Sequence, residues 1–481
     1  MGDNGSKLGL TFVLIHSLHG MRTKSSRQRD LWLRVHLTIA LIAGLFLALI
    51  GLAGSLSVYG EVLDEWLNPA LTVEKQAGPS LSLDRIMAAV RAAHPDRPGS
   101  WVLELPRAPG RALTAWYEAP AETAGELYAP LMVSVNPYTA EIVASRFWGR
   151  TAATWLLDLH TQLHWGRTGW NFVGVLGVML GASAVTGLYL WWPGVAGLKR
   201  AFGFRHDAGA LRLALDLHRN IGLFAALPLL ALAFTGALLA FPNIPEALVG
   251  SSGMSHGDDG PTVRSSALPD GHPVGLDEAV LLARGPFPHA EVRRVATPRG
   301  PTGTYRISLR QRSEVNQRHP VTTVWVDQYS GQIREVRNPS RFTAGETALT
   351  WLWPLHTGEA LGPWGRFLWL LAGLTPGVLY ITGLVRWLIG RGSLPDFDVD
   401  LNGWRRHVEQ VLERAVEKGV LLYRFTKPSI SRAAKRLGRL LAKRKESMAR
   451  LRERRAEARA KAGSHGRKKK GRQPFRSAPL K

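Results

Sequence analysis

Four long apolar stretches dominate the pattern of hydrophobic and polar positions along the chain. No Asp, Glu, Lys or Arg occurs between Arg34 and Glu61, Arg167 and Lys199, Arg219 and Glu246, or Arg366 and Arg386. An α-helix rises about 1.5 Å per residue, so a stretch of about 19 residues or more can cross a hydrocarbon core of about 30 Å. The pattern predicts four transmembrane helices, at residues 31–60, 153–192, 213–241 and 350–390.

The two long connections between these helices, 61–152 and 242–349, follow a different pattern. Each opens with a helical segment, at 83–90 and at 276–282, and continues in alternating strands separated by turns, such as the segment 304–309. Each closes on a strand, a turn at Asn136 or Asp327, and a second strand. We therefore predict an α-helical membrane protein that carries two α+β domains outside the membrane.

Basic residues indicate which way the chain crosses the membrane. Residues 1–34 carry six Lys/Arg and two acids, and the connection 193–217 carries four Lys/Arg and two acids. Short basic loops stay on the cytoplasmic side. This places the N-terminus (1–30), the loop 193–212 and the tail 391–481 in the cytoplasm, with both α+β domains on the outer side. For a bacterial chain, that orientation corresponds to the inner membrane and the periplasm.

Charge and composition exclude several functions. Residues 391–481 hold 27 Lys/Arg and 9 Asp/Glu, so that +18 of the net charge of +24 lies in the tail. We expect the tail to be attracted to anionic membrane lipid, and nucleic-acid binding is not expected. The chain has no Cys, which excludes disulfides, iron–sulfur clusters, thiolate zinc sites and haem attached through a C-x-x-C-H motif.

The membrane helices are duplicated. An offset of 182 residues places His218 on His36 and Gly236 on Gly54, and no gap is needed. An offset of 196 aligns the second and fourth helices in the same way, again without a gap. It matches His356 to His160, Gly362 to Gly166, Gly365 to Gly169, Thr382-Gly383 to Thr186-Gly187 and Trp387 to Trp191. The chain is predicted to be a tandem duplication of one unit, namely helix, outer domain, helix.

The duplicated histidines are the candidate functional residues. His36 and His218 lie near charged residues at the cytoplasmic ends of their helices, whereas His160 and His356 precede the apolar runs at the outer ends. A single His near a helix end can simply anchor the helix at the lipid headgroups. Four at symmetric positions indicate a function, because an ionisable residue at membrane depth is costly without a partner.

Two imidazoles without Cys or paired carboxylates suit the two axial positions of a haem iron better than a four-ligand zinc site. We therefore predict two non-covalent haems, one held by His36 and His218 and the other by His160 and His356. His164, one turn after His160, is a reserve ligand or a contact for a haem propionate or a proton. Its counterpart under the offset of 196 is Ala360, so the duplication does not select it.

Local sequence around these histidines resembles the PepSY-associated transmembrane family. The resemblance rests on Val35-His36, Leu217-His218-Arg219, Leu159-His160, Leu355-His356-Thr357-Gly358, the run 186–193 (TGLYLWWP) and the turns at Asn136 and Asp327. It covers residues 30–392. Members include iron-regulated inner-membrane proteins and ferric-siderophore reductases.

The resemblance implies two b-type haems on the His pairs, PepSY-like folds for the outer domains, and electron transfer across the inner membrane. It also implies an oxidoreductase that reduces a ferric siderophore or another ferric chelate in the periplasm. The electron would come from a cytoplasmic or quinol donor in trans, because no flavodoxin-like or nicotinamide-binding domain is present. The alternative is a non-catalytic regulator of the cell envelope, or a protease-inhibitor-like protein, whose helices are only anchors.

Overall fold

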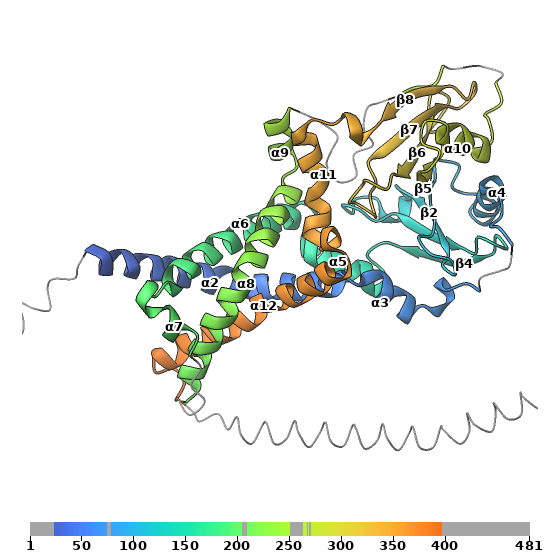
Figure 1. Ribbon diagram of the computed structural model, residues 1–481. Helices are drawn as coiled ribbons and strands as arrows, with labels where there is room; N and C mark the ends of the chain where they lie inside the picture. Colours follow the sequence, from blue (N-terminus) through green and yellow to red (C-terminus); the bar gives the residue numbers. More distant parts are fainter. Residues whose placement is uncertain are drawn as a thin grey trace, which may run out of the picture. The chain divides into compact units, whose positions relative to one another are not determined.

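Four long apolar helices form a bundle in the computed structural model, which describes residues 24–74, 78–203, 209–250, 263–266, 268 and 271–396. These helices are α2 (Lys24–Ser57), α6 (Gly166–Trp191), α8 (Ala210–Ala240) and α12 (Gly362–Gly390), and each is long and apolar enough to cross a membrane (Figure 1). Large apolar side chains on them point outward, including Ile42, Leu227 and Phe234, each of which is more than half exposed. A surface of this kind suits lipid rather than water. The protein is thus a multi-pass helical membrane protein.

The bundle is held together where small residues let helices approach. Helix α2 packs against α12 where Gly51 faces the backbone of Gly373, and Ser55 Oγ donates a hydrogen bond of 2.9 Å to the Leu370 carbonyl. Helix α6 packs in the corresponding way against α8. Close approach through glycine is usual in membranes, where dispersion contacts and interhelical hydrogen bonds replace the hydrophobic effect.

Both ends of the bundle are marked by polar contacts. At one end Arg29, near the start of α2, donates to the Leu190 carbonyl near the end of α6, and Asp396 accepts from the Leu211 amide at the start of α8. At the other end Arg366 donates to the Val58 carbonyl. The order of the helix ends agrees with four antiparallel crossings.

Residues 1–23 and 397–481, and with them the expected role of the basic tail, lie outside the described residues.

Two of the predicted membrane helices are broken in two, which corrects the sequence prediction. The segment 153–192 forms α5 (Ala152–Gln162) and α6, and the segment 350–390 lies on α11 (Ala344–Thr357) and α12. The first break contains Leu163 and His164, both with a positive φ. The second contains Gly358 (φ 79°) and Gly362 (φ 62°), where glycine tolerates a left-handed backbone. The outer histidines therefore stand on short helices of their own.

The remaining helices are short. They are α3 (Gly60–Leu67), α7 (Leu198–Ala201) and α9 (Asn243–Val249), together with α4 (Leu83–Ala93) and α10 (Leu276–Arg284), which lie beside the sheet. Single 3₁₀ turns occur at Pro69–Leu71, Ala121–Thr123, Val195–Gly197, Pro339–Arg341 and Glu359–Leu361.

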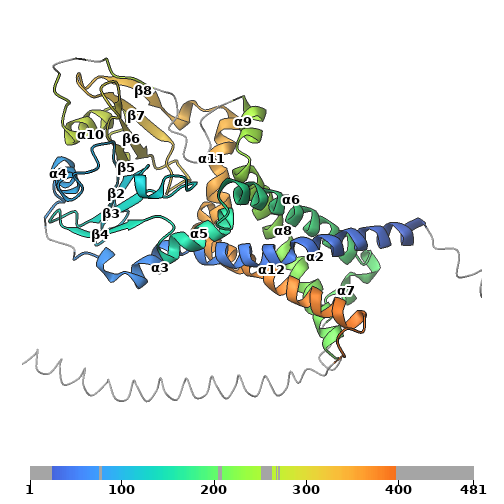
Figure 2. The same cartoon turned by 180° about the vertical axis from the view of Figure 1, so that it is seen from behind.

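One antiparallel sheet of eight strands lies outside the helix bundle, in the order β4-β3-β2-β1-β5-β6-β7-β8. This sheet and the helices α4 and α10 are called the outer region below. The first half supplies β1 (Val102–Glu104), β2 (Leu113–Tyr117), β3 (Leu131–Val135) and β4 (Ile142–Phe147). The second supplies β5 (Glu291–Ala296), β6 (Thr304–Arg310), β7 (Thr322–Asp327) and β8 (Ile333–Arg337). Each half is a helix followed by a four-stranded meander, as the alternating pattern predicted (Figure 2).

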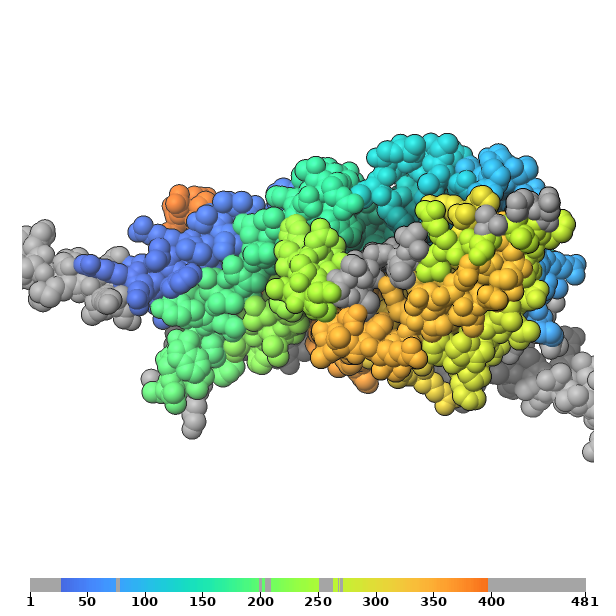
Figure 3. Space-filling model, turned by 90° about the horizontal axis from the view of Figure 1, so that it is seen from above, coloured from blue at the N-terminus to red at the C-terminus, as the bar shows by residue number. Residues whose placement is uncertain are grey.

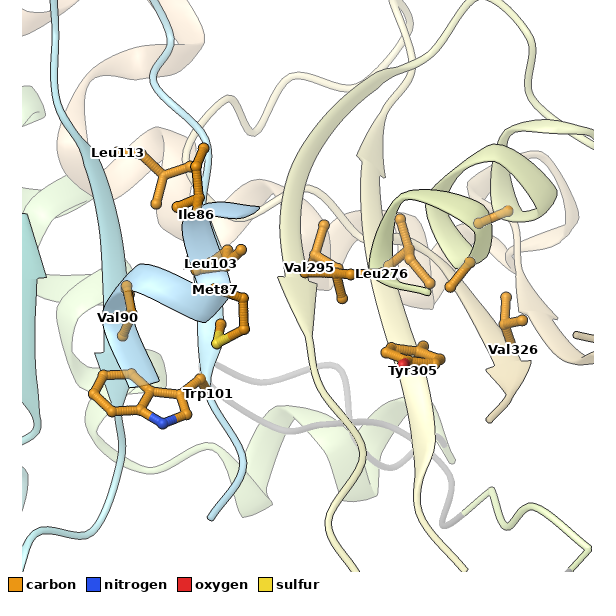
Figure 4. Packing of buried hydrophobic residues seen from close by; sticks show 14 of the residues in the cluster. Ile86, Met87, Val90, Trp101, Leu103, Leu113, Leu276, Val295, Tyr305 and Val326 are labelled. Carbon is orange, nitrogen blue, oxygen red and sulfur yellow. The ribbon is translucent and has the colours of Figure 1, made fainter. Parts of the chain in front are cut away.

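The two halves do not form separate domains but share one sheet. Strands β1 and β5 pair antiparallel, with Val102 opposite Ala296 and Leu103 opposite Val295. Adding 193 to the number of Val102 gives Val295, and subtracting 193 from that of Ala296 gives Leu103. Exchanging the two halves therefore turns the first residue pair into the second, and a pseudo-twofold axis passes between the two strands. Helices α4 and α10 cover the same face, and residues of both halves, such as Ile86, Leu103, Leu276 and Val295, form a single core (Figure 4). The sequence predicted two α+β units but not their fusion.

Two aspartates join the halves at the ends of the covering helices. The Asp277 carboxylate accepts hydrogen bonds from the Leu83 and Asp84 amides, and the Asp84 carboxylate accepts from the Leu276 and Asp277 amides, at 2.8–3.1 Å. Each aspartate thus caps the other helix. Burial raises the pKa of Asp84, but hydrogen bonds from Leu276 and Asp277 outweigh it and the pKa is lowered.

Removing either of these helix caps is expected to destabilise the outer region. Asp84→Ala or Asp277→Ala should each lower the free energy of unfolding of this region by about 1–2 kcal/mol, the usual effect of losing a helix cap. The lowered pKa of Asp84 means that its contribution is present above the unfolded-state value of about 4 and is lost as the pH falls through the lower folded value. Thermal unfolding followed between pH 7 and pH 3 measures both effects. Asp96→Ala, outside the caps, is the control, and equal stability of the three variants would contradict the expectation.

Candidate functional site

The four predicted histidines come together in two pairs. His36 on α2 and His218 on α8 have ring centroids 6.3 Å apart, with ring planes at 89°. His160 on α5 and His356 on α11 have centroids 6.0 Å apart, with planes at 36°. Below, the first is called the inner pair and the second the outer pair. The structure brings together the same partners that the duplication predicts.

The pairs lie near opposite ends of the bundle. The outer histidines contact Gly54 on α2 and Gly236 on α8, each 18 residues after an inner histidine on the same helix. Eighteen residues of α-helix span about 27 Å. The two sites are therefore separated by most of the thickness of a bilayer.

At the inner pair, each Nδ1 atom has an acceptor on the neighbouring helix. His36 Nδ1 lies 3.0 Å from Thr186 Oγ1, whose own hydrogen is donated to the Ala182 carbonyl. His218 Nδ1 lies 3.0 Å from the Leu379 carbonyl and 3.1 Å from Thr382 Oγ1. A carbonyl only accepts, and a threonine that already donates its hydrogen accepts as well. We therefore assign the proton of both imidazoles to Nδ1.

The outer pair follows the same rule with different partners. His160 Nδ1 donates to the Ile50 carbonyl at 2.9 Å. His356 Nδ1 lies 3.0 Å from Thr235 Oγ1, which donates its hydrogen to the Ala231 carbonyl at 2.7 Å. All four imidazoles thus keep the Nε2 lone pair free of a proton. A histidine held through Nδ1–H and coordinating through Nε2 is the usual arrangement for a metal ligand.

Glycines leave room for the four rings. A Cβ atom on Gly54 would lie 2.6 Å from His160 Cε1, and one on Gly236 would lie 2.9 Å from His356 Cε1. Gly187 and Gly383 face His36 and His218 in the same manner, at 3.4 and 3.3 Å. The offsets of 182 and 196 that relate the histidines also relate these glycines. The repeat in the sequence therefore already marked both the histidines and the glycines that face them.

The spacing within each pair fits one metal ion between two imidazoles. With a metal–nitrogen bond of about 2 Å and about 1.2 Å from nitrogen to ring centre, two rings on opposite sides of one metal have centroids about 6–6.5 Å apart. Among the described residues no group of three or more His, Cys, Asp or Glu could hold a metal ion. Each pair therefore offers two axial ligands, which suits an iron whose other four ligands come from a macrocycle.

Buried polar atoms without partners add to this fit. The indole nitrogen of Trp369 is buried and has no hydrogen-bond partner among the described residues. Trp369 precedes Leu370, which is bonded to Ser55, so it lies at the level of the outer pair. Near the inner pair the buried side-chain oxygen of Asn220 is in the same state, two residues after His218. Orphaned polar groups of this kind are expected where a polar ligand binds.

His164 does not share a helix face with His160, contrary to the sequence prediction. Helix α5 ends at Gln162, and His164 lies in the left-handed turn that follows. Its ring packs on Trp155 at a centroid distance of 4.7 Å. The break in the helix turns His164 away from the position that one further helical turn would have given it. The prediction of a propionate or proton contact stays a prediction.

Three residues of the site were not singled out for their role. Thr186 and Thr382, which hold the inner imidazoles, are matched by the offset of 196, so the repeat itself was a usable signal. Thr235 holds His356, but its counterpart under the offset of 182 is Ala53, and His160 uses the Ile50 carbonyl instead. Only the structure identifies the outer acceptors.

A buried carboxyl group lies on the short helix that carries His160. Asp158 on α5 is 7% exposed and accepts a hydrogen bond of 2.9 Å from the Trp148 indole nitrogen. Burial raises the pKa of Asp158, although hydrogen bonds from Trp148 and Gln162 act against it. Since Trp148 follows β4, this bond attaches the sheet to the helix that carries His160.

A profile of the family described as the PepSY-associated TM region matches residues 33–389. The matched range contains the whole sheet, both histidine pairs, α6 and α8, and most of α2 and α12. Among curated proteins the chain has no match.

Proposed function

The chain belongs to the family of PepSY-associated TM regions, and we propose that it is a di-haem electron-transfer protein that reduces ferric chelates, ferric siderophores in particular. One observation carries the proposal. Two imidazole pairs, each imidazole held through its Nδ1 atom and each pair spaced for a single iron, stand near the two ends of a transmembrane bundle. An envelope regulator anchored by its helices would not need them.

The residues present fit two b-type haems. His36 and His218 would be the axial ligands at the inner site, and His160 and His356 those at the outer site. A bound haem supplies a carrier that accepts and releases one electron at a time. The protein contributes the orientation of each imidazole, through Nδ1–H bonds to Thr186, Leu379, Ile50 and Thr235, and an apolar bundle that excludes water.

The reaction is a one-electron reduction. Each ferric ion in the chelate takes up one electron, and the donor is oxidised by one electron per iron released. Ferric iron is a hard ion that oxygen donors hold tightly, whereas ferrous iron binds the same oxygens more weakly, so reduction frees the metal. The donor would be a cytoplasmic reductant or a quinol, supplied in trans.

The location follows from the same proposal. We place the protein in the bacterial inner membrane with both termini in the cytoplasm, so that the inner pair lies on the cytoplasmic side. The eight-stranded sheet, taken as two fused PepSY-like units, then lies in the periplasm beside the outer pair. The basic tail would bind anionic lipid on the cytoplasmic surface.

An anaerobic reoxidation assay tests the proposed function. Purified protein should show the Soret band of b-type haem, with about two haems per chain. After reduction with dithionite and removal of the excess, ferric chelates should reoxidise it while ferrous iron appears in a trapping assay. If a protein that contains both haems is reoxidised by no hydroxamate, catecholate or carboxylate chelate, the reductase function is wrong.

A further inference from the structure

The face of the sheet away from α4 and α10 carries a cluster of arginines. Side chains alternate between faces along a strand, so Glu104, opposite Arg294, points away from the core residue Leu103. A β-bulge between Val292 and Arg294 interrupts the alternation, and Arg293 also reaches this face, where it pairs with Glu291. The arginine cluster, as the term is used below, comprises Arg107, Arg293, Arg294, Arg310 and Arg318.

Carboxylates neutralise this cluster only in part. The acids bonded to it are Glu61, Glu104 and Glu291, and Glu61 is shared, at 2.6 Å from Arg107 and 3.5 Å from Arg318. Burial lowers the pKa of Arg293; the charge of Glu291 acts against this shift, whereas the charges of Arg310 and Arg107 act in the same direction as burial. Several guanidinium groups are thus held together with a deficit of negative charge.

Hydrogen-bond donors in the cluster are also left over. The Nε atoms of Arg293, Arg294 and Arg310 are buried and have no hydrogen-bond partner among the described residues. A buried donor without an acceptor is costly, and in a native protein it calls for a missing water or anion. Three such donors on two adjacent strands favour an anionic ligand.

Aromatic side chains border the cluster. Tyr128 is 51% exposed, yet burial raises its pKa to about 12, with the charges of Arg294 and Arg318 acting against this shift. Tyr128 packs on Trp148 at 5.2 Å, and Trp148 packs on Trp116 at 6.0 Å. These rings offer stacking surfaces to an aromatic ligand.

The cluster adjoins both helices that carry the outer histidines. On one side Trp148 donates to Asp158 of α5, two residues before His160. On the other side His319, next to Arg318 in the β6–β7 loop, packs on Trp353 of α11, three residues before His356, at 4.9 Å. Figure 3 shows the first half of the sheet region, in cyan, beside the second half, in yellow and orange. The ion pairs of Glu104 with Arg294 and of Glu61 with Arg318 join residues of both halves within the cluster.

We propose that the arginine cluster, together with Tyr128, binds an anionic ferric chelate of the catecholate type next to the outer histidine pair. The proposal rests on the proposed function and narrows its substrate class. Three catecholate dianions leave a ferric complex with net negative charge and three aromatic rings, whereas three hydroxamate monoanions only neutralise the ion. Guanidinium groups can form charge-assisted bonds to the catecholate oxygens, and Tyr128 can stack on a catechol ring. Both interactions favour the catecholate chelate over the hydroxamate chelate.

Gallium(III) chelates test this site without any reduction, since gallium(III) has the charge of ferric iron but does not accept an electron here. Binding of a gallium(III) triscatecholate and of a gallium(III) trihydroxamate to the purified haem-loaded protein would be followed by tryptophan fluorescence. We expect the triscatecholate to bind about tenfold or more tightly, with a preference that shrinks as salt is raised. Equal affinities for the two chelates would overturn the proposal.

Variants locate the site. Arg294→Gln and Arg318→Gln should each weaken triscatecholate binding about five- to tenfold, as expected when one charge-assisted contact is lost. Arg85→Gln removes the same charge from α4 on the opposite face and should change nothing. Haem content and the melting temperature verify folding, and Arg294→Lys, which keeps the charge, should bind better than Arg294→Gln. Arginine variants that bind like Arg85→Gln would contradict the proposal.

The two proposals can fail separately. If gallium triscatecholate binds as described but no ferric chelate reoxidises the protein, the anion site stands and the reductase function is wrong. If ferric chelates reoxidise the protein while gallium binding ignores charge and the arginine variants, the function stands and this site is wrong.

Discussion

Replacing His160 by Ala is expected to remove about half of the bound haem and to abolish the reduction of ferric chelates by protein reduced beforehand with dithionite. The reason is geometric. His160 and His356 supply the two nitrogens of the outer site, 6.0 Å apart between ring centres, and the described residues provide no third ligand there. His356→Ala should give the same result. Haem content per chain, from the pyridine haemochrome spectrum, and ferrous iron trapped per chain measure the two effects.

His164→Ala is the matched control for this prediction. It removes an imidazole four residues from His160, but one that packs on Trp155 outside the pair, and it should leave both haems in place. Loss of the outer haem in His164→Ala but not in His160→Ala would show that the wrong histidine has been chosen.

Electron paramagnetic resonance identifies which haem is lost. The planes of the inner imidazoles are nearly perpendicular, at 89°, whereas the outer planes meet at 36°. Low-spin ferric haems with perpendicular axial imidazoles give a strongly anisotropic signal, and more parallel ones give a rhombic signal. His160→Ala should therefore remove the rhombic signal.

Replacing His36 or His218 by Ala is expected to remove about half of the haem and to block reduction that is driven from the cytoplasmic side. The inner pair stands about 27 Å along the helices from the level of the outer pair. An electron that enters from the cytoplasmic side therefore needs a carrier at the inner pair before it can reach the outer pair. Vesicles with a reductant only on the cytoplasmic side measure this block. Protein reduced directly with dithionite should still reduce a ferric chelate, because the outer pair is intact.

His94→Ala is a suitable control, since His94 lies in the outer region, where its ring contacts Ser145 and Trp101 and neither histidine pair. It should retain both haems and electron transfer from the cytoplasmic side. If His36→Ala sustains transfer from the cytoplasmic side at the wild-type rate, the outer site has its own route to the donor and the inner pair has another role.

Much of the architecture was predictable because it depends on local patterns. Uncharged stretches predict membrane helices whatever their neighbours are, since a bilayer demands about 20 apolar residues of each. The four long helices lie within or overlap the predicted segments, although α6 and α12 begin 13 and 12 residues later than predicted because α5 and α11 are separate helices. The breaks after Gln162 and Thr357 were missed, because a left-handed residue such as Leu163 carries no strong signal of its own.

The fusion of the two outer units was not predictable in this way. Pairing of β1 with β5 joins residues nearly 200 positions apart, and Leu103 or Val295 would look the same in a separate domain. The reciprocal caps of Asp84 and Asp277 are equally hidden, since an Asp in the first turn of a helix is an ordinary helix-start signal.

The sequence by itself determined the membrane class, the internal repeat and the identity of the four histidines, because hydropathy and repeat offsets are properties of single segments compared along the chain. Only the tertiary structure decided that the histidines meet with ring centroids 6.0 and 6.3 Å apart and with an acceptor at each Nδ1 atom. It alone also assembled Arg107, Arg294 and Arg318 on one face of the sheet. The physical reason is that hydrogen-bond acceptors and charge clusters form between segments far apart in sequence, where no local pattern records the contact.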